Sequence, residues 1–192
     1  MKATKNNIIS LPHDSLRQRS KRVGLISDDI LTIVDQMKEA TLDWESHREH
    51  ELGVALAAVQ INQLYRIIIV RHDLENKADK HFDCFINPEI TKREGPVIED
   101  FEGCLSIKDI YGKVPRHHKI KLKALDISGK QIRLTAEGFL ARVLQHEIDH
   151  TKGTLFIDHI KDNAESFFRL SEKGELEKID YEATVKNSRI LW

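Results

Sequence analysis

The sequence predicts an α+β fold in which antiparallel or mixed β-sheets pack around one central helix. The strongest indication is the segment 136–151, where apolar residues recur at helical spacing. Short segments that are rich in β-branched residues, or that alternate charged and apolar residues, come before it. Strands grouped ahead of a helix favour α+β over a repeating strand-helix layout.

Composition narrows the class of protein. The 192 residues, 40% of them apolar and 32% charged, suit one globular domain and exclude disorder. A net charge of −1 gives no sign of a general polyanion binder, so we expect no direct nucleic-acid readout. The two cysteines, Cys84 and Cys104, are too few for a disulfide framework. Without a signal-peptide pattern or a membrane-spanning apolar stretch, we expect a cytoplasmic protein.

The first half of the chain predicts one helix and several strands. The helix covers 28–44, with Ser27 as its N-cap and acidic residues in its first turn. An apolar run of small residues follows at 52–60, and 72–80 is a polar loop. The expected extended segments are 66–70, then 82–86 ended by Asn87 and Pro88, and a short piece after Gly95 and Pro96. The alternating segments 119–126 and 131–134 flank a turn and predict a hairpin.

The helix expected at 136–151 contains the pattern H-E-x-x-H as His146, Glu147 and His150. Two histidines four residues apart lie on one helix face and can hold one metal ion, while the intervening glutamate can move protons. Chance occurrence is the competing explanation. The apolar stripe continues into these three residues, however, and buried polar groups are costly unless they are bonded or coordinated. The stripe consists of Phe139, Leu140, Val143 and Leu144. Gly153 follows where the helix is expected to end.

A catalytic metal site of this type needs a third protein ligand. The position six residues after His150 holds Phe156, which cannot ligate, and this weakens the metalloprotease interpretation. Cys104 is the better candidate because its surroundings are polar, although an isolated cysteine is more often a small buried hydrophobe. Downstream carboxylates in a solvated, charged segment are the weaker alternative; they are Glu165, Glu172, Glu175 and Glu177.

Three segments together resemble the motifs of the peptide deformylases in order and spacing. They are Gly53–Gln60 (GVALAAVQ), Glu102–Ser106 (EGCLS) and Gln145–His150 (QHEIDH). Further similarity covers 11–23, 114–116 and 153–158, so the resemblance extends to about residue 160. The first motif departs from the family, which usually has glycine at the position of Ala55 and commonly proline at that of Val59. Because a Cβ obstructs close approach, Ala55 would narrow the substrate groove or alter the turn.

The resemblance implies a catalytic domain over 1–160. The charged segment 161–192 is then a C-terminal extension of the same domain, which we expect to be helical, with Phe167, Phe168 and Leu170 as anchors. The apolar end of the chain, 190–192, indicates packing no more strongly than chance.

The resemblance also implies an activity, namely removal of the N-formyl group from the initiator methionine of new polypeptides, with release of formate. One metal ion would be held by Cys104, His146 and His150, with water in the fourth position; Fe²⁺ is the common physiological ion, and Zn²⁺ or Ni²⁺ fits the same donors. Glu147 would be the general base, and the Gln60 side-chain amide and the Leu105 N–H would stabilise the developing oxyanion. Gly53, Val54, Ala55 and Gly103 would bind substrate. Glu102 is expected to be a structural ion-pair partner of Arg116 rather than a catalyst.

Three alternatives accompany this hypothesis. Ala55 motivates a deformylase-like protein with altered substrate preference or weak activity. A metallopeptidase would share the chemistry of Glu147 but needs a non-cysteine ligand, and a purely structural metal site needs a fourth protein ligand. His117, His118 and His159 are expected to be surface or structural residues. From the implied substrate we expect N-formyl-methionyl nascent peptides as partners, a transient encounter with the ribosome, no membrane and a monomer.

Overall fold

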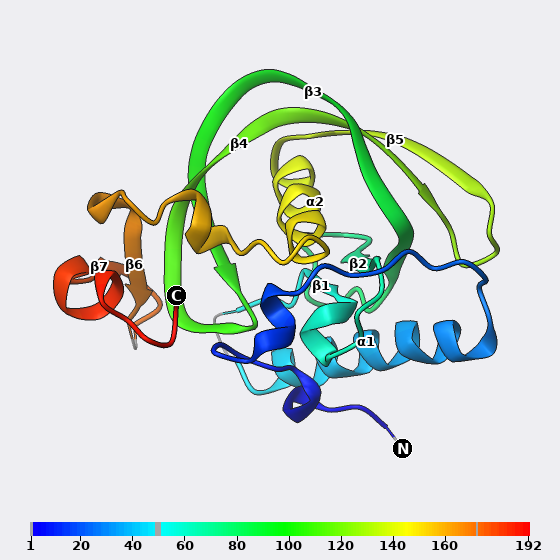
Figure 1. Cartoon of the computed structure of the whole chain (residues 1–192), viewed down its shortest axis with the longest axis horizontal. Helices are drawn as coiled ribbons and strands as arrows, with labels where there is room; N and C mark the ends of the chain where they lie inside the picture. The colour runs from blue at the N-terminus through cyan, green and yellow to red at the C-terminus, as the bar shows by residue number, and fades with distance from the viewer. Residues whose placement is uncertain (1, 49–50, 172) are drawn as a thin grey trace.

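The computed structural model describes residues 2–48, 51–171 and 173–192. A seven-stranded sheet with the order β1-β2-β3-β4-β6-β7, to which β5 is added by pairing with β4, encloses helix α2 (Figure 1). Every pairing between named strands is antiparallel, which confirms the predicted α+β class. The elements are α1 (Asp28–Ser46), β1 (Ala55–Ala57), β2 (Ile67–Arg71), β3 (Phe82–Cys104), β4 (Ile107–Leu125), β5 (Gln131–Glu137), α2 (Gly138–His150), β6 (Phe167–Leu170) and β7 (Leu176–Lys178). Short 3₁₀ turns connect them at Lys5–Asn7, Asp14–Arg17, Ala58–Ile61, Phe156–His159 and Ala164–Ser166, and a single π turn covers Glu182–Lys186.

Helix α1 forms where the sequence predicts it and extends two residues beyond the predicted end. Ser27 is the N-cap residue, although its side chain makes no capping hydrogen bond. The negative carboxylates of Asp28 and Asp29 in the first turn instead stabilise the helix by interacting with the positive N-terminal end of its dipole. One face of the helix is buried against β2, and its apolar members are Ile30, Ile33, Val34, Met37 and Ala40.

The predicted short strands at 82–86 and after 95–96 are in fact parts of one strand, β3, so the predicted ends at Asn87, Pro88 and Gly95 are wrong. The register between β3 and β4 shifts between Ile86 and Glu89 and again between Glu94 and Val97. Asn87 and Gly95 have positive φ angles of 53° and 73° at these bulges. A bulge accommodates turn-forming residues and bends the strand without ending it. The bends let β3 and β4 curve around α2 (Figure 1).

The predicted hairpin and central helix are confirmed with small differences in their bounds. Strand β5 pairs with β4 and continues to Glu137, so α2 begins at Gly138 instead of residue 136 and ends at His150 instead of residue 151. Gly153 follows with φ of 77°, and a Cβ there would lie 2.3 Å from the carbonyl oxygen of Arg17. The end of α2 therefore needs glycine both for its backbone conformation and for its close contact with the N-terminal segment.

The C-terminal extension is not the helix that the sequence predicts. Phe167, Phe168 and Leu170 lie on strand β6, which pairs with β4, and β7 pairs with β6. Backbone groups of β4 at Tyr111 and Gly112 thereby find partners, a tertiary contact that local spacing does not reveal. The end of the chain also packs, since the Leu191 side chain is buried in the same cluster as β4 residues.

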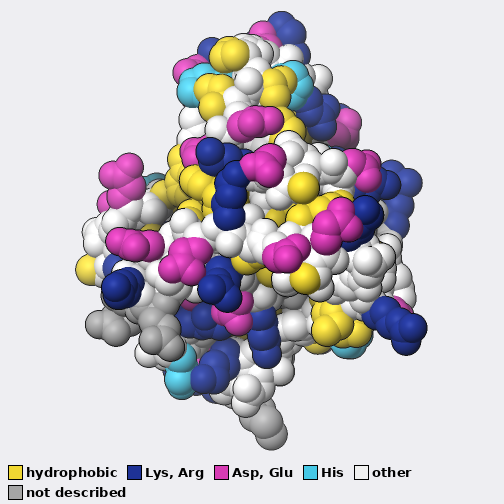
Figure 2. Space-filling view, turned by 90° about the vertical axis from the view of Figure 1, so that its left-hand side faces the viewer, with side chains coloured by type: hydrophobic (Ala, Val, Ile, Leu, Met, Phe, Trp, Pro, Cys, Tyr) yellow, Lys and Arg dark blue, Asp and Glu magenta, His cyan; other side chains and the backbone are white. Residues whose placement is uncertain are grey.

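The surface charges and the hydropathy of the helices can be compared with what the composition predicts. On the face that carries β6 and β7, Lys and Arg side chains are interspersed with Asp and Glu (Figure 2). In the described parts of the chain, none of the helices combines the length and the apolar character that crossing a membrane requires.

A buried ion pair joins α1 to β2 and holds the segment that precedes β1. The Arg71 guanidinium and the Glu45 carboxylate are paired with side-chain exposures of 0% and 2%. Both also bind Gly53: its N–H donates to Glu45 Oε2 at 3.2 Å, and its C=O accepts from Arg71 Nε at 3.2 Å. A Cβ on Gly53 would lie 2.7 Å from Thr41 Cγ2. The ion pair therefore fixes the start of β1 against α1.

We expect Arg71→Met to lower the free energy of unfolding by about 3 kcal/mol, because it leaves a buried carboxylate that has lost its main partner. This loss is at the lower end of the range for breaking a buried ion pair, because Glu45 keeps a second partner: Lys80 Nζ lies 3.0 Å from Glu45 Oε1. Equilibrium urea unfolding measures the change. Arg169→Met is the control, because its ion pair with Glu177 is exposed and its loss should leave stability unchanged. A loss below about 1 kcal/mol for Arg71→Met, as for an exposed pair, would contradict the assignment.

Candidate metal centre

Three predicted ligands converge at the end of β3. Cys104 is the last residue of β3, and His146 and His150 lie one turn apart on α2. One ligand atom from each, the thiol sulfur and two ring nitrogens, lies within 4.8 Å of the others. His150 Nε2 is 3.3 Å from Cys104 Sγ, close to the spacing of roughly 3.5 Å that ligands of a tetrahedral ion adopt. A thiolate and two imidazoles in this arrangement fit a divalent metal ion.

The set has three members and no more among the residues that the structure describes. No fourth His, Cys, Asp or Glu joins it, as a closed structural site would require. Of the downstream carboxylates considered as alternatives, Glu165, Glu175 and Glu177 lie outside the group, and Glu172 is not among the described residues. The other cysteine, Cys84, packs against α1, and burial raises the pKa of its thiol to about 12.

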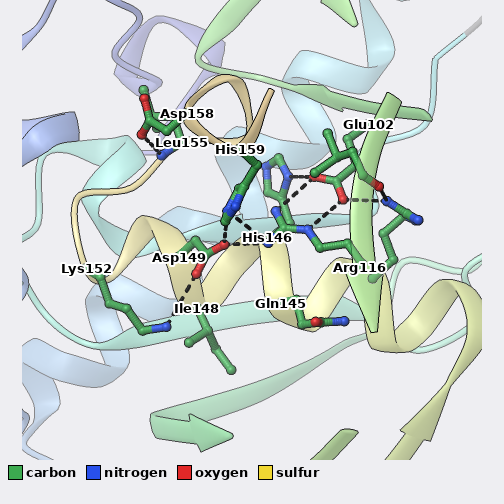
Figure 3. A network of polar contacts seen from close by, with 12 residues as sticks. Glu102, Arg116, Gln145, His146, Ile148, Asp149, Lys152, Leu155, Asp158 and His159 are labelled. Atoms are coloured by element: carbon green, nitrogen blue, oxygen red, sulfur yellow. Dashed lines mark hydrogen bonds and ion pairs between the residues drawn. The ribbon is translucent and has the colours of Figure 1, made fainter. Parts of the chain in front are cut away.

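Glu102 orients His146. Its Oε2 lies 2.9 Å from His146 Nδ1, so the carboxylate accepts the Nδ1–H and leaves Nε2 free toward Cys104 (Figure 3). Arg116 donates to both Glu102 oxygens, at 2.9 and 3.1 Å, as the sequence predicts. Burial by itself would raise the pKa of Glu102, but the hydrogen bonds from His146 and Arg116 outweigh it and hold the pKa at about 2. The carboxylate is therefore ionised and fixes the tautomer of His146.

Two further members of this network are not evident from the sequence. Arg142 on α2 donates to Glu102 Oε1 at 2.8 Å and to the Val114 carbonyl of β4 at 2.7 Å. The helical spacing predicts that Arg142 is buried, but it does not indicate which group pairs with the guanidinium. Asp149 accepts from Arg116 at 2.5 Å and contacts His159 Nε2 at 2.8 Å (Figure 3). The network joins β3, β4, α2 and the segment after α2 around the ligands.

The other histidines that the structure describes lie outside the ligand group. His159 has the structural role that the sequence predicts, through Asp149. The backbone of His117 exchanges hydrogen bonds with the Gln145 side chain, which anchors α2 to β4.

Glu147 lies beside the ligands on the inner face of α2 with 5% of its surface exposed. Its Oε2 atom has no hydrogen-bond partner among the described residues. Burial raises the pKa of the carboxyl group to about 7. A carboxyl group with a free oxygen and a pKa near neutrality is suited to accept and return a proton.

Gln60 faces the metal centre from the 3₁₀ turn after β1, with 1% of its surface exposed. Its Oε1 accepts the backbone N–H of Ala57 at 2.8 Å, which directs the amide nitrogen to the other side. There Nε2 lies 3.6 Å from Cys104 Sγ and 3.1 Å from Ser106 Oγ. The amide donor is thus held next to the ligands.

A cavity of about 150 Å³ adjoins the metal centre. Its walls combine apolar side chains with the groups described above; they are Val54, Ala55, Gln60, Phe101, Glu102, Gly103, Cys104, Leu105, Phe139, Arg142, Val143, His146 and Glu147. Of the predicted substrate-binding residues, Gly53 is not part of this lining. Phe139, expected on the buried stripe of α2, is 50% exposed, because the first turn of the helix lies at the opening of the cavity.

Comparison with known proteins agrees with this geometry. The family model described as polypeptide deformylase matches residues 5–166. The chain belongs to this family. Among its relatives, the peptide deformylase of Thermomicrobium roseum is 39% identical over 160 residues, covering 82% of this chain and 86% of that protein. Peptide deformylase 1 of Clostridium perfringens is 43% identical over 144 residues, covering 75% of this chain and 90% of that protein.

Solved structures of the family agree as well. That of a peptide deformylase from Synechococcus elongatus in complex with actinonin superposes with a TM-score of 0.73 at 33% identity, covering 81% of this chain and 80% of that one. The peptide deformylase from Legionella pneumophila gives a TM-score of 0.71 at 34% identity, covering 83% of this chain and 86% of that one. The family resemblance and the predicted enzyme class, a metal-dependent hydrolase, are confirmed.

We expect Glu102→Gln to weaken metal affinity by about 10- to 100-fold, because the amide accepts the His146 proton less strongly and its orientation is no longer fixed by charge. Competition with a chromophoric chelator for Zn²⁺ measures the change. Glu99→Gln is the matched control, since Glu99 is an exposed carboxylate on the same strand. Unchanged affinity in a folded Glu102→Gln variant would mean that packing alone orients His146.

Proposed function

We propose that this protein hydrolyses the N-formyl group of the initiator methionine on new polypeptides and releases formate. The observation that carries the proposal is the convergence of Cys104, His146 and His150 beside Glu147, whose Oε2 has no partner among the described residues, at a cavity. These three side chains would hold one divalent ion. When bound, the ion would supply Lewis-acid activation of water and of the formyl carbonyl.

Glu147 would move the protons of the reaction. Its free Oε2 would accept a proton from the attacking water, since a pKa of about 7 allows the carboxylate to be regenerated at neutral pH. The same group would return the proton to the departing amine, whose C–N bond breaks as formate is formed.

Gln60 and Leu105 would stabilise the negative charge that develops on the formyl oxygen. The Gln60 amide nitrogen is directed at the metal centre by the Ala57 N–H, so it needs no reorganisation during the reaction. Leu105 lies in the short turn between β3 and β4 and lines the cleft next to Cys104. Its backbone N–H is the second proposed donor.

Strand β1 would bind the peptide backbone. It is the last strand at one side of the sheet, so no strand of the described residues pairs with its second edge, which we call the open edge. Arg71 N–H donates to the Val54 C=O, and Ala55 then pairs with Val70. In an antiparallel ladder the backbone groups alternate, so those of Ala55 point away from β2 and toward the open edge. Ala57 follows the same alternation, because its N–H reaches Gln60 instead of β2.

This register assigns different roles to the predicted substrate-binding residues. Ala55 would pair with an extended peptide, and Val54 and Gly103 would contact it from the cleft wall. The N–H and C=O of Gly53 are both engaged by Glu45 and Arg71. We therefore propose that Gly53 positions β1 from behind the site.

For the cofactor we propose Fe²⁺, on the basis of the family resemblance, with Zn²⁺ or Ni²⁺ able to occupy the same Cys-His-His donors. The proposed partners are N-formyl-methionyl nascent peptides, and this substrate implies a transient encounter with the ribosome in the cytoplasm. We propose that the chain acts as a monomer, without reading nucleic acid directly.

The proposal is tested by loading the protein anaerobically with Fe²⁺ and offering a short formyl-methionyl peptide and its unformylated twin. We expect formate release from the first peptide and backbone cleavage of neither. Glu147→Ala should keep the metal and lose about 10²- to 10⁴-fold in rate, whereas Glu165→Ala, an exposed carboxylate in the C-terminal extension, should match the parent. Absence of formate at high concentration of the metal-bound parent would refute the function, and backbone cleavage would indicate a peptidase.

The alternative with altered substrate preference depends on Ala55, whose side chain is 3% exposed and lines the cleft. We expect Ala55→Gly to raise kcat/KM for formyl peptides with a bulkier first side chain, relative to formyl-methionine, by up to about tenfold, because one methyl group is removed from the wall. Steady-state kinetics on a series of first residues measures the ratio. Val59→Ala is the control, since Val59 is buried outside the lining. An unchanged ratio would mean that Ala55 does not narrow the site.

A further inference from the structure

Strand β6 lies outside the part of the chain that the family model matches, which ends at residue 166. It nevertheless adds to the sheet next to the active-site cleft. Tyr111 and Gly112 of β4 pair with Phe168 and Phe167 of β6 on one side, and the same stretch of β4 pairs with Phe101 and Glu102 of β3 on the other. The extension is thus one strand removed from the cleft wall.

A direct contact crosses that strand. The rings of Phe168 and Phe101 meet edge to face, with centroids 4.9 Å apart and planes at 83°. Phe168 is 8% exposed, whereas Phe101 is partly exposed and lines the cleft. Lys113 Nζ lies 5.3 Å from the Phe101 centroid and 5.9 Å from that of Phe168, so a cation covers the pair from outside.

The cleft wall at Gly103, next to Phe101, is contacted by a residue of the same β4–β6 pairing. Tyr111, opposite Phe168 in the register, places its ring so close to Gly103 that a Cβ on Gly103 would lie 2.6 Å from it. Gly103 also lines the cleft. Two consecutive contacts, Phe168 with Phe101 and Tyr111 with Gly103, therefore support the wall from behind.

The extension is itself anchored to the catalytic part of the chain. Arg17 donates to the Leu191 carbonyl at 2.7 Å and to both oxygens of Asp158. Within the extension, the Trp192 indole N–H donates to the Val185 carbonyl at 2.7 Å, which ties the last residue to the turn at Glu182–Lys186. With its far end held in this way, β6 is a fixed support for the ring of Phe101.

We propose that Phe168 is a positioning residue for substrate binding, acting through Phe101 to fix the cleft wall that receives the first apolar side chain of the substrate. Phe168 itself does not touch the cleft. Without Phe168, the Phe101 ring loses its edge-to-face partner and gains rotamer freedom. Binding of the substrate must then order the ring, and this entropic cost weakens binding. This inference rests on the proposed function, because it concerns the formyl-methionyl side chain.

The test compares the Fe²⁺-loaded parent, Phe168→Ala and Phe168→Tyr in formate release from formyl-methionyl and formyl-alanyl peptides. For formyl-methionine we expect KM to rise about two- to tenfold in Phe168→Ala, the range of an aromatic pair, with kcat unchanged. The short alanyl side chain should show no such change. Phe168→Tyr, which keeps the ring edge, should restore the KM of the parent.

Leu170→Ala is the matched control, because Leu170 lies on the same strand and face but opposite Leu176. It should leave KM unchanged, and thermal unfolding checks that each variant is folded. Phe101→Ala should raise KM similarly, and adding Phe168→Ala to it should have no further effect. An unchanged KM in folded Phe168→Ala, equal effects of Phe168→Ala and Leu170→Ala, or additivity with Phe101→Ala would overturn the proposal. A parent that releases no formate would instead refute the proposed function.

Discussion

The ionised carboxylate of Glu102 is the interaction on which the site depends. A buried charge is costly unless it is fully paired, and here Arg116, Arg142 and His146 pair it from β4 and α2. Because Glu102 lies on β3, one side chain joins the two long strands to the central helix. The same carboxylate sets the tautomer of His146 and lies two residues before Cys104. Fold and ligand geometry are thus linked at a single group.

The long curved strands make this arrangement attainable. A short, flat strand could not both pair with β2 at residues 82–86 and end beside α2 at Cys104. The bulges near Asn87 and Gly95 bend β3 between these two places. They also explain how a chain with so many turn-forming residues builds one continuous strand. The tight turn after Cys104 then returns the chain along β4, which supplies Arg116.

The cleft is assembled in layers from distant parts of the sequence. Strand β1 is the end strand of the sheet, α2 supplies His146, His150 and Glu147, and the hairpin of β3 and β4 supplies Cys104 and the opposite wall. Behind that wall lies the C-terminal extension, which pairs with β4 and contacts Phe101. The three ligands and Glu147 therefore lie on the inner elements, and the C-terminal extension lies outside them.

The sequence by itself determined the central helix, the hairpin and the family, because these are expressed in local spacing. His146, Glu147 and His150 carry their geometry in a four-residue period, and Cys104 is recognisable from its adjoining motif. Only the tertiary structure decided that Asn87 and Gly95 bend a strand instead of ending it, and that Phe168 belongs to a strand instead of a helix. It also decided that Arg142 pairs with Glu102 and that the backbone of Gly53 bonds to Glu45 and Arg71. These outcomes depend on tertiary contacts or on the register between strands, and neither is encoded in local periodicity.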